Sequence, residues 1–100
     1  MALKAAFMFL APGADAIRDR SVVTTAEVEL IVVGVADYAA AEEAAKNLVA
    51  EGVVALELCG GFGHVGTARI AQAVESKAAV GVVRFDSHPG LEGKSGDSLF

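Results

Sequence analysis

The chain lacks the residues that cross-link small extracellular domains. Cys59 is its single cysteine, and it has two prolines and no tryptophan in 100 residues. One cysteine excludes an intrachain disulfide, which is typical of proteins in a reducing compartment, so we expect a cytoplasmic protein. Aromatic residues make up 6% of the chain. The composition therefore gives no indication of the stacking surfaces that bind single-stranded nucleic acid.

Basic residues are also scarce. Eight lysines and arginines stand against thirteen acidic residues, which gives a net charge of −5. This balance argues against binding to the phosphate backbone of a nucleic acid, and we expect neither a nucleic-acid nor a membrane partner. The apolar run at residues 1–11 ends at Pro12-Gly13 and is only about half of a membrane span, so we interpret it as a β-strand.

Apolar residues, by contrast, are abundant. They make up 54% of the chain, above the roughly 45–50% of an average domain. A chain of this length buries only about two-thirds of its unfolded surface, so a fraction of these side chains must stay outside the core. The excess predicts a subunit interface or a lined pocket, and we expect a homo-oligomer, a dimer or larger.

The pattern of apolar and turn residues predicts a single α/β domain over residues 1–100. Asp37 has the side chain of a helix N-cap, and Gly52 is suited to the left-handed residue that ends the same helix. A second helix is predicted over residues 65–76. The polar segment 12–26 is interpreted as a long connection with room for one short helix, and the tail after residue 86 as irregular. Four strands are expected, at residues 2–11, 28–35, 53–59 and 79–86.

Strands that alternate with helices over short connections predict a mainly parallel, four-stranded sheet with right-handed βαβαβ crossovers, either Rossmann-like or half-barrel-like. Two crossover helices between neighbouring strands cover the same face of such a sheet. Parallel sheets need cover on both faces. We therefore expect the second face to be covered by the 12–26 segment, by the tail or by another subunit.

A glycine-rich turn lies between the third predicted strand and the second helix. Its sequence matches G-x-G-x-x-G, and Asp86 follows twenty residues after its last glycine. In this context the pattern is typical of dinucleotide binding, because free N–H groups at the start of a helix attract an anion. The sequence thus predicts an anion-binding turn made of Gly60, Gly61, Gly63, Gly66 and Thr67.

A complete dinucleotide site fits the chain less well. Only one mononucleotide-binding half follows from the pattern, little chain remains after Asp86, and Arg69 stands where close helix packing favours a small residue. Two alternatives stay open: a small phosphate-bearing or anionic ligand, or glycines that only allow a short turn to close. Whether a cofactor binds is unknown from the sequence.

His64, Asp86 and His88 are expected near the carboxyl ends of the strands, where open α/β sheets bind ligands. A histidine beside an acid can act as a general base, so these three are our candidate catalytic residues. Two histidines and an acid could equally hold a metal ion. A third interpretation is a purely structural turn. The spacing does not decide among them, and we assign no residue as a metal ligand.

Glu57 and Arg84 place charges inside apolar strands, which is costly unless the charges are paired. We expect either an ion pair across neighbouring strands or a pocket that both residues line. In the second case Arg84 would bind a carboxylate or phosphate. Cys59 is interpreted as a packed residue, with a nucleophilic role as the weaker alternative.

The segments ELCGGFGHVGTARIA and GVVRFDSHPG, together with the opening KAAFMFLAPGAD, resemble a family of roughly hundred-residue bacterial proteins of unknown function. The likeness covers nearly the whole chain. It implies a small α/β protein but no established activity. The signature residues that it implies are Glu57, Cys59, Gly60, Gly61, Gly63, His64, Arg84, Asp86, His88 and Gly90.

From the sequence we thus expect a small protein that binds an anionic or phosphorylated molecule at the glycine turn. A non-catalytic assembly or interaction module and a metal-dependent enzyme using His64, Asp86 and His88 are the alternatives. Whether the chain is an enzyme stays undecided.

Overall fold

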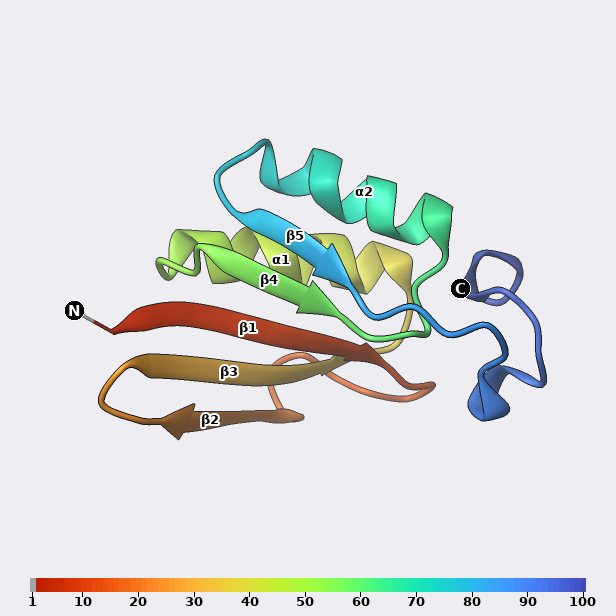
Figure 1. Cartoon of the computed structure of the whole chain (residues 1–100), viewed down its shortest axis with the longest axis horizontal. Helices are drawn as coiled ribbons and strands as arrows, with labels where there is room; N and C mark the ends of the chain where they lie inside the picture. The colour runs from red at the N-terminus through yellow and green to blue at the C-terminus, as the bar shows by residue number, and fades with distance from the viewer. Residues whose placement is uncertain (1) are drawn as a thin grey trace.

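A computed structural model describes residues 2–100 of the chain (Figure 1). Five strands and two α-helices are followed by a tail that contains two short 3₁₀ turns. In chain order they are β1 (Leu3–Leu10), β2 (Arg20–Thr24), β3 (Val28–Val35), α1 (Tyr38–Ala50), β4 (Ala55–Leu58), α2 (His64–Val74), β5 (Ala79–Val82), η1 (Pro89–Leu91) and η2 (Gly96–Ser98).

The sheet has five strands in the order β2-β3-β1-β4-β5, and four of them are parallel. The α/β class and the mainly parallel sheet are confirmed, but the expected number of four strands is wrong. The additional strand is β2, antiparallel to β3 at the edge, within the segment interpreted as a connection. Its two β-branched valines suit an extended backbone. Arg20 fixes it further through an ion pair to Glu51 after α1.

Both helices lie where the sequence places them. Asp37 caps α1 by accepting a hydrogen bond from the Ala40 N–H at 2.8 Å, and Gly52 adopts a φ of 103° just after the helix. Helix α2 ends at Val74, earlier than expected, because Glu75 and Ser76 both turn into the left-handed region. Among residues 2–100 no helix is both long enough and apolar enough to cross a membrane.

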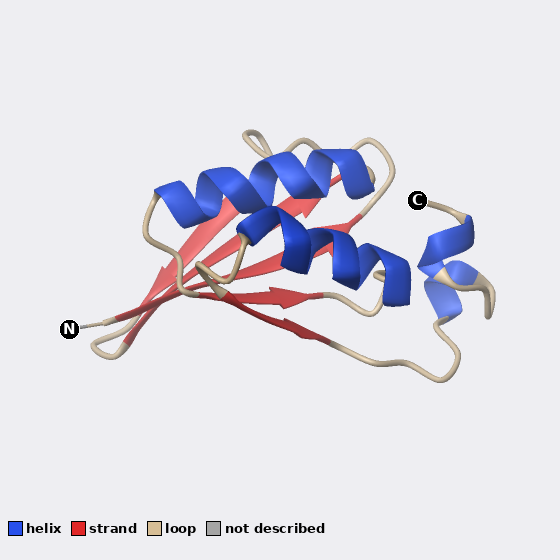
Figure 2. Cartoon of the chain, turned by 90° about the horizontal axis from the view of Figure 1, so that it is seen from above, coloured by secondary structure: helices blue, strands red, loops and turns tan. Residues whose placement is uncertain are grey.

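The core lies between the two helices and one face of the sheet (Figure 2). Register places the inward-facing residues of neighbouring strands side by side, so that they form continuous rows across the sheet. The fully buried residues of these rows include Ala6, Met8, Ile31, Val33, Leu56 and Leu58.

The opposite face of the sheet, here called the open face, is not covered by a helix. Both crossover helices lie on the other side, and the connection from β1 to β3 is the β2 strand rather than a helix. In Figure 1 the strands lie in front of α1, and no segment of residues 2–100 passes in front of them. The expected cover by the 12–26 segment or the tail is therefore absent. By register the open face comprises Leu3, Ala5, Phe7, Phe9, Ser21, Val23, Val28, Leu30, Val32, Gly34, Ala55, Glu57, Ala79 and Gly81.

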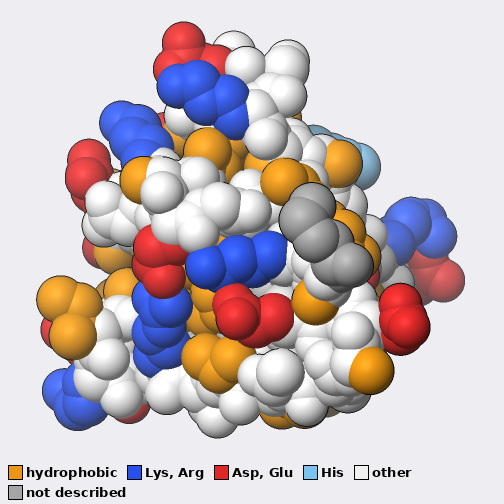
Figure 3. Space-filling view, turned by 90° about the vertical axis from the view of Figure 1, so that its left-hand side faces the viewer, with side chains coloured by type: hydrophobic (Ala, Val, Ile, Leu, Met, Phe, Trp, Pro, Cys, Tyr) orange, Lys and Arg blue, Asp and Glu red, His pale blue; other side chains and the backbone are white. Residues whose placement is uncertain are grey.

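The two ends of the sheet differ in character. Figure 3 shows the end at which β1 starts, where side chains of both charges mix. Lys4 bridges there, with its Nζ 2.7 Å from the Glu51 carbonyl oxygen and 3.6 Å from a Glu29 carboxylate oxygen. The tail packs at the other end, beyond the carboxyl ends of the parallel strands (Figure 1).

Leu58 tests the core described above. We expect Leu58→Ala to lower the free energy of unfolding by about 2–5 kcal/mol, because it removes a fully buried side chain and leaves a cavity. Val54→Ala is the matched control, since half of that side chain is exposed, and should cost less than about 1 kcal/mol. Urea denaturation of both variants checks this. Equal losses would contradict the placement of the core.

Candidate functional site

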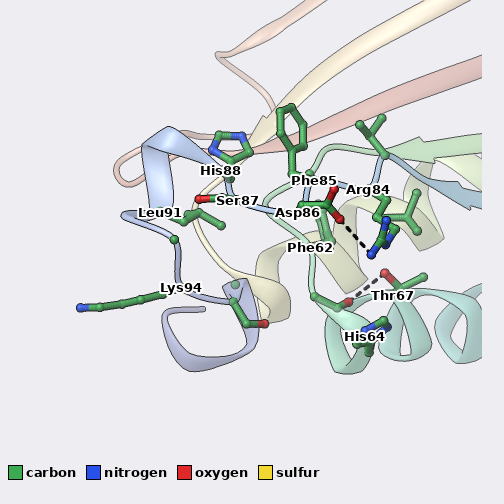
Figure 4. Close-up of a pocket in the computed structure, with 17 residues that line it drawn as sticks. Phe62, His64, Thr67, Arg84, Phe85, Asp86, Ser87, His88, Leu91 and Lys94 are labelled. Carbon is green, nitrogen blue, oxygen red and sulfur yellow. Dashed lines mark hydrogen bonds and ion pairs between the residues drawn. The ribbon is translucent and has the colours of Figure 1, made fainter.

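A cavity of about 400 Å³ lies between the glycine turn, the end of β5 and the tail (Figure 4). Its walls come from segments far apart in the sequence, because β4 and β5 are neighbours and both end at this rim. Seven of the ten predicted site residues line it: Gly60, Gly63, His64, Thr67, Arg84, Asp86 and His88. The position of His64, Asp86 and His88 at this rim follows from the strand ends, as the sequence indicated.

The start of α2 is capped by a residue from the other end of the chain. The Asp97 carboxylate accepts hydrogen bonds from the backbone N–H groups of Val65 and Gly66, both at 3.0 Å. These are the second and third residues of the helix, the positions that a local N-cap side chain normally satisfies. Gly63, the N-cap of α2, has no side chain to do so. Asp97 therefore replaces the missing local cap.

Tyr38 joins this cap to the first helix. Its hydroxyl group donates to Asp97 Oδ1 at 2.7 Å and accepts from the Gly63 N–H at 3.0 Å. The ring is buried and stacks on Phe62, with centroids 5.6 Å apart. The guanidinium carbon of Arg69 also lies over this ring, 5.5 Å from its centroid. Burial is the main cause that raises the pKa of Tyr38 to about 12, so the hydroxyl stays protonated as a donor.

The glycines of the turn are explained by this packing. A Cβ atom at Gly63 would lie 2.5 Å from the Asp97 carboxyl group, and one at Gly66 would overlap the Tyr38 ring. On the tail, a Cβ atom at Gly96 would overlap the carbonyl oxygen of Gly61. In a dinucleotide site, glycines in this pattern let a pyrophosphate lie close to the backbone. Here they let the protein's own tail and the Tyr38 ring lie close to it.

The expectation that the amides of the turn are free for an external anion is therefore wrong for this conformation. The favourable site for negative charge at the start of α2 exists, as the helix dipole requires. It is occupied by Asp97. Gly61 and Gly66 do not reach the cavity, and both are buried against the protein's own side chains.

Thr67 also serves the start of the helix, since its hydroxyl donates to the Gly63 carbonyl oxygen at 2.9 Å (Figure 4). His64 is the first residue of α2 and is exposed at the cavity rim. It lies close enough to Asp97 to favour the charged carboxylate.

Arg84 and Glu57 do not form the predicted pair. The strand β5 ends at Val82, so Arg84 lies beyond it, where its guanidinium group contacts Asp86 at 2.9 Å (Figure 4). Glu57 projects from β4 onto the open face, opposite Phe7 and Gly81 in the register. Arg84 lines the cavity as the second interpretation expected, and Glu57 does not.

The expected cluster of two histidines and an acid is not formed. His88 uses Nδ1 to accept from the Gly90 N–H at 3.0 Å, and its ring packs on Phe85 with centroids 4.5 Å apart. Asp86 is engaged by Arg84. Within residues 2–100 no group of three or more His, Cys, Asp or Glu side chains is placed to hold a metal ion. The geometry thus gives no support to the metal-dependent alternative.

Cys59 has a packing role. Its Sγ accepts from the backbone N–H groups of Leu10 at 3.4 Å and Gly61 at 3.3 Å, which fixes the entry to the glycine turn.

The sequence reasoning missed two residues that organise the site, Tyr38 and Asp97. Tyr38 is the first residue of α1, and nothing in its position in the sequence indicates the contacts of its hydroxyl group. Asp97 lies in the segment interpreted as irregular. One signal was present, because a helix that starts at a glycine needs a capping acceptor from elsewhere.

Comparison with known proteins is consistent with this picture. Residues 3–98 match a family of unknown function, DUF6506. The chain belongs to that family. No curated protein and no solved structure matches it. No function has thus been assigned by similarity, and any function must be argued from the site.

Asp97→Ala tests the long-range cap. We expect it to lower the free energy of unfolding by about 1–2 kcal/mol, the usual cost of a lost N-cap, and to speed hydrogen exchange at Val65 and Gly66. Asp86→Ala is the control, because its carboxylate is 85% exposed and pairs only at the surface. Unchanged exchange at both amides in the Asp97 variant would contradict the cap.

The cap also predicts a pH dependence. Partial burial alone would raise the pKa of Asp97, but hydrogen bonds from Val65, Tyr38 and Gly66 hold it below its ordinary value of 3.8. Because the folded-state pKa is depressed, this stabilisation is fully present above about pH 4 and is lost as pH falls through the folded-state pKa.

Denaturant unfolding of wild type and Asp97→Asn at several pH values measures this contribution. Their difference in free energy should be largest near neutral pH and should shrink in acid. The two proteins are compared because the stability of each also changes with pH at other sites. Ion pairs lower the pKa values of Glu42 and Glu51 in both proteins, and this contribution cancels in the difference. A difference that stays constant down to acid pH would contradict the assignment.

Proposed function

We propose that the chain binds a small anionic molecule in the cavity beside the glycine turn. The observation that carries this proposal is the charge of the walls. Two positively charged side chains, Arg84 and Lys94, line the cavity against one acidic side chain, Asp86, and the imidazoles of His64 and His88 stand among them. The chain as a whole carries a net charge of −5, so this local excess of basic groups runs against its average.

The size and lining suit a ligand with an apolar part. A cavity of about 400 Å³ lies in the range of roughly 300–1,000 Å³ found for small-molecule sites. Phe62, Leu91 and Val82 supply apolar wall, and hydroxyl groups of Ser87 and Ser95 stand among them. We expect a molecule with one carboxylate or phosphate group on a small apolar body.

Arg84 is the residue expected to bind the anionic group. Its guanidinium group can contact a carboxylate or phosphate through two parallel hydrogen bonds. Its present partner, Asp86, is 85% exposed, and exposed ion pairs contribute little. A ligand anion can therefore replace Asp86 at small cost. In this proposal the start of α2 stays occupied by Asp97, which excludes the pyrophosphate placement of a dinucleotide site.

The geometry favours binding over catalysis. In a nucleophile–base arrangement, a third group, often a carboxylate, orients the histidine. Within the described chain, His88 Nδ1 is engaged by the Gly90 N–H and Asp86 by Arg84, and no histidine bonds to a carboxylate. A second candidate function, an assembly module, is supported by the open face.

Binding is tested by thermal unfolding with phenyl phosphate, benzoate, inorganic phosphate and, as the uncharged control, phenol. We expect the aromatic anions to raise Tm and phenol to leave it unchanged. At a hundredfold excess over Kd the stabilisation is about 2.7 kcal/mol, which shifts the Tm of a domain of this size by roughly ten degrees or more.

Arg84→Ala should weaken the binding of phenyl phosphate at least tenfold. Lys46→Ala is the matched control, because this lysine lies on α1 outside the cavity and has only a weak partner, with its Nζ 3.9 Å from a Glu43 carboxylate oxygen. Absence of a shift with every anion, or equal shifts in the Arg84 and Lys46 variants, would defeat the proposal.

A further inference from the structure

We propose that the open face is the contact surface of a homodimer. Two copies of the chain stack sheet against sheet about a two-fold axis that runs along β1. The proposal is independent of ligand binding, since it rests on the face of the sheet and not on the cavity.

The open face is continuous and apolar. Its central positions carry Phe7, Leu30 and Val32, and its margins carry Leu3 and Val23, which are 48% and 55% exposed. Only two of its members are polar, Ser21 and Glu57. Monomeric proteins rarely expose a contiguous apolar patch of this extent unless the patch has a partner.

The area of the open face is close to the smallest area that stable dimers bury. Strands lie about 4.8 Å apart and rise about 3.3 Å per residue, so five strands of these lengths span roughly 500 Å² in projection. Because side chains project from the strands, the accessible area is larger, on the order of 600 Å² per copy. This value per copy is near the lower end for specific interfaces.

A second copy fits this face because its two halves differ in size. The β1, β3 and β2 side carries phenylalanine, leucine and valine, whereas β4 and β5 carry Ala55, Ala79 and Gly81. A two-fold axis along β1 places the bulky half of each copy over the small half of its partner. Packed sheets lie about 10 Å apart, a gap that such complementary side chains fill.

The same axis keeps the charged residue of the face, Glu57, away from its copy in the second chain. Glu57 lies one strand from the axis, so the two carboxylates fall on opposite sides of it, with their strands about 14 Å apart. Each Glu57 lies opposite the partner's Val32, because Glu57 and Val32 share a row through Phe7. Gly81 follows Glu57 in the same row, and the axis places the polar Ser21 of the second copy over Gly81, so each Glu57 has a polar neighbour across the interface.

The first experiment is sedimentation equilibrium of the full chain at micromolar concentration. Wild type should have twice the chain mass of 10.2 kDa. Val32→Asp should raise the dissociation constant at least tenfold, with circular dichroism unchanged. Ala71→Asp on the exposed side of α2 is the control and should stay dimeric. A monomeric wild type, or equal effects of the two substitutions, would overturn the proposal.

The second experiment tests the two-fold axis along β1 by comparing a positive with a negative side chain at position 32. Val32→Lys should retain the dimer, because the new ammonium group meets the partner's Glu57, whereas Val32→Asp does not. Adding Glu57→Gln to Val32→Lys should remove this rescue and raise the dissociation constant again. If Val32→Lys disrupts the dimer as strongly as Val32→Asp, the axis along β1 is overturned.

Discussion

The structure depends on one carboxylate from the tail that completes the second helix. The hydrogen bonds of Asp97 to Val65 and Gly66, and that of Tyr38 to Asp97, join the tail, the glycine turn and α1 into one network. Without it the N–H groups of Val65 and Gly66 would have no side-chain acceptor, because the N-cap is a glycine. This contact helps to hold the tail beside the glycine turn, where the tail forms one wall of the cavity.

This network changes the meaning of the glycine pattern. Glycines at such a turn indicate that something approaches the backbone closely, but the pattern alone does not say what. Here Asp97 and the Tyr38 ring fill the space at Gly63 and Gly66. The negative charge that the helix start favours is thus supplied from within the chain, and a ligand anion is left to the basic side chains of the cavity.

The sequence predicted what depends on local pattern. Asp37 and Gly52 marked the first helix, and the order of strands and helices gave the mainly parallel sheet and the rim along which His64, Asp86 and His88 lie. It missed β2, whose short valine pair gives a weak signal at a sheet edge. It also missed the Tyr38–Asp97 contact, because a bond between residues 59 positions apart leaves no periodicity to detect.

The central claim is that Asp97 accepts from the start of α2 in the folded chain. Nuclear magnetic resonance can follow the side-chain carboxyl carbon of Asp97 and the amide protons of Val65 and Gly66 through one pH titration. The account predicts one shared midpoint below the ordinary aspartate pKa of 3.8 for all three signals. A carboxyl midpoint at the ordinary value, with the two amides unaffected, would contradict it.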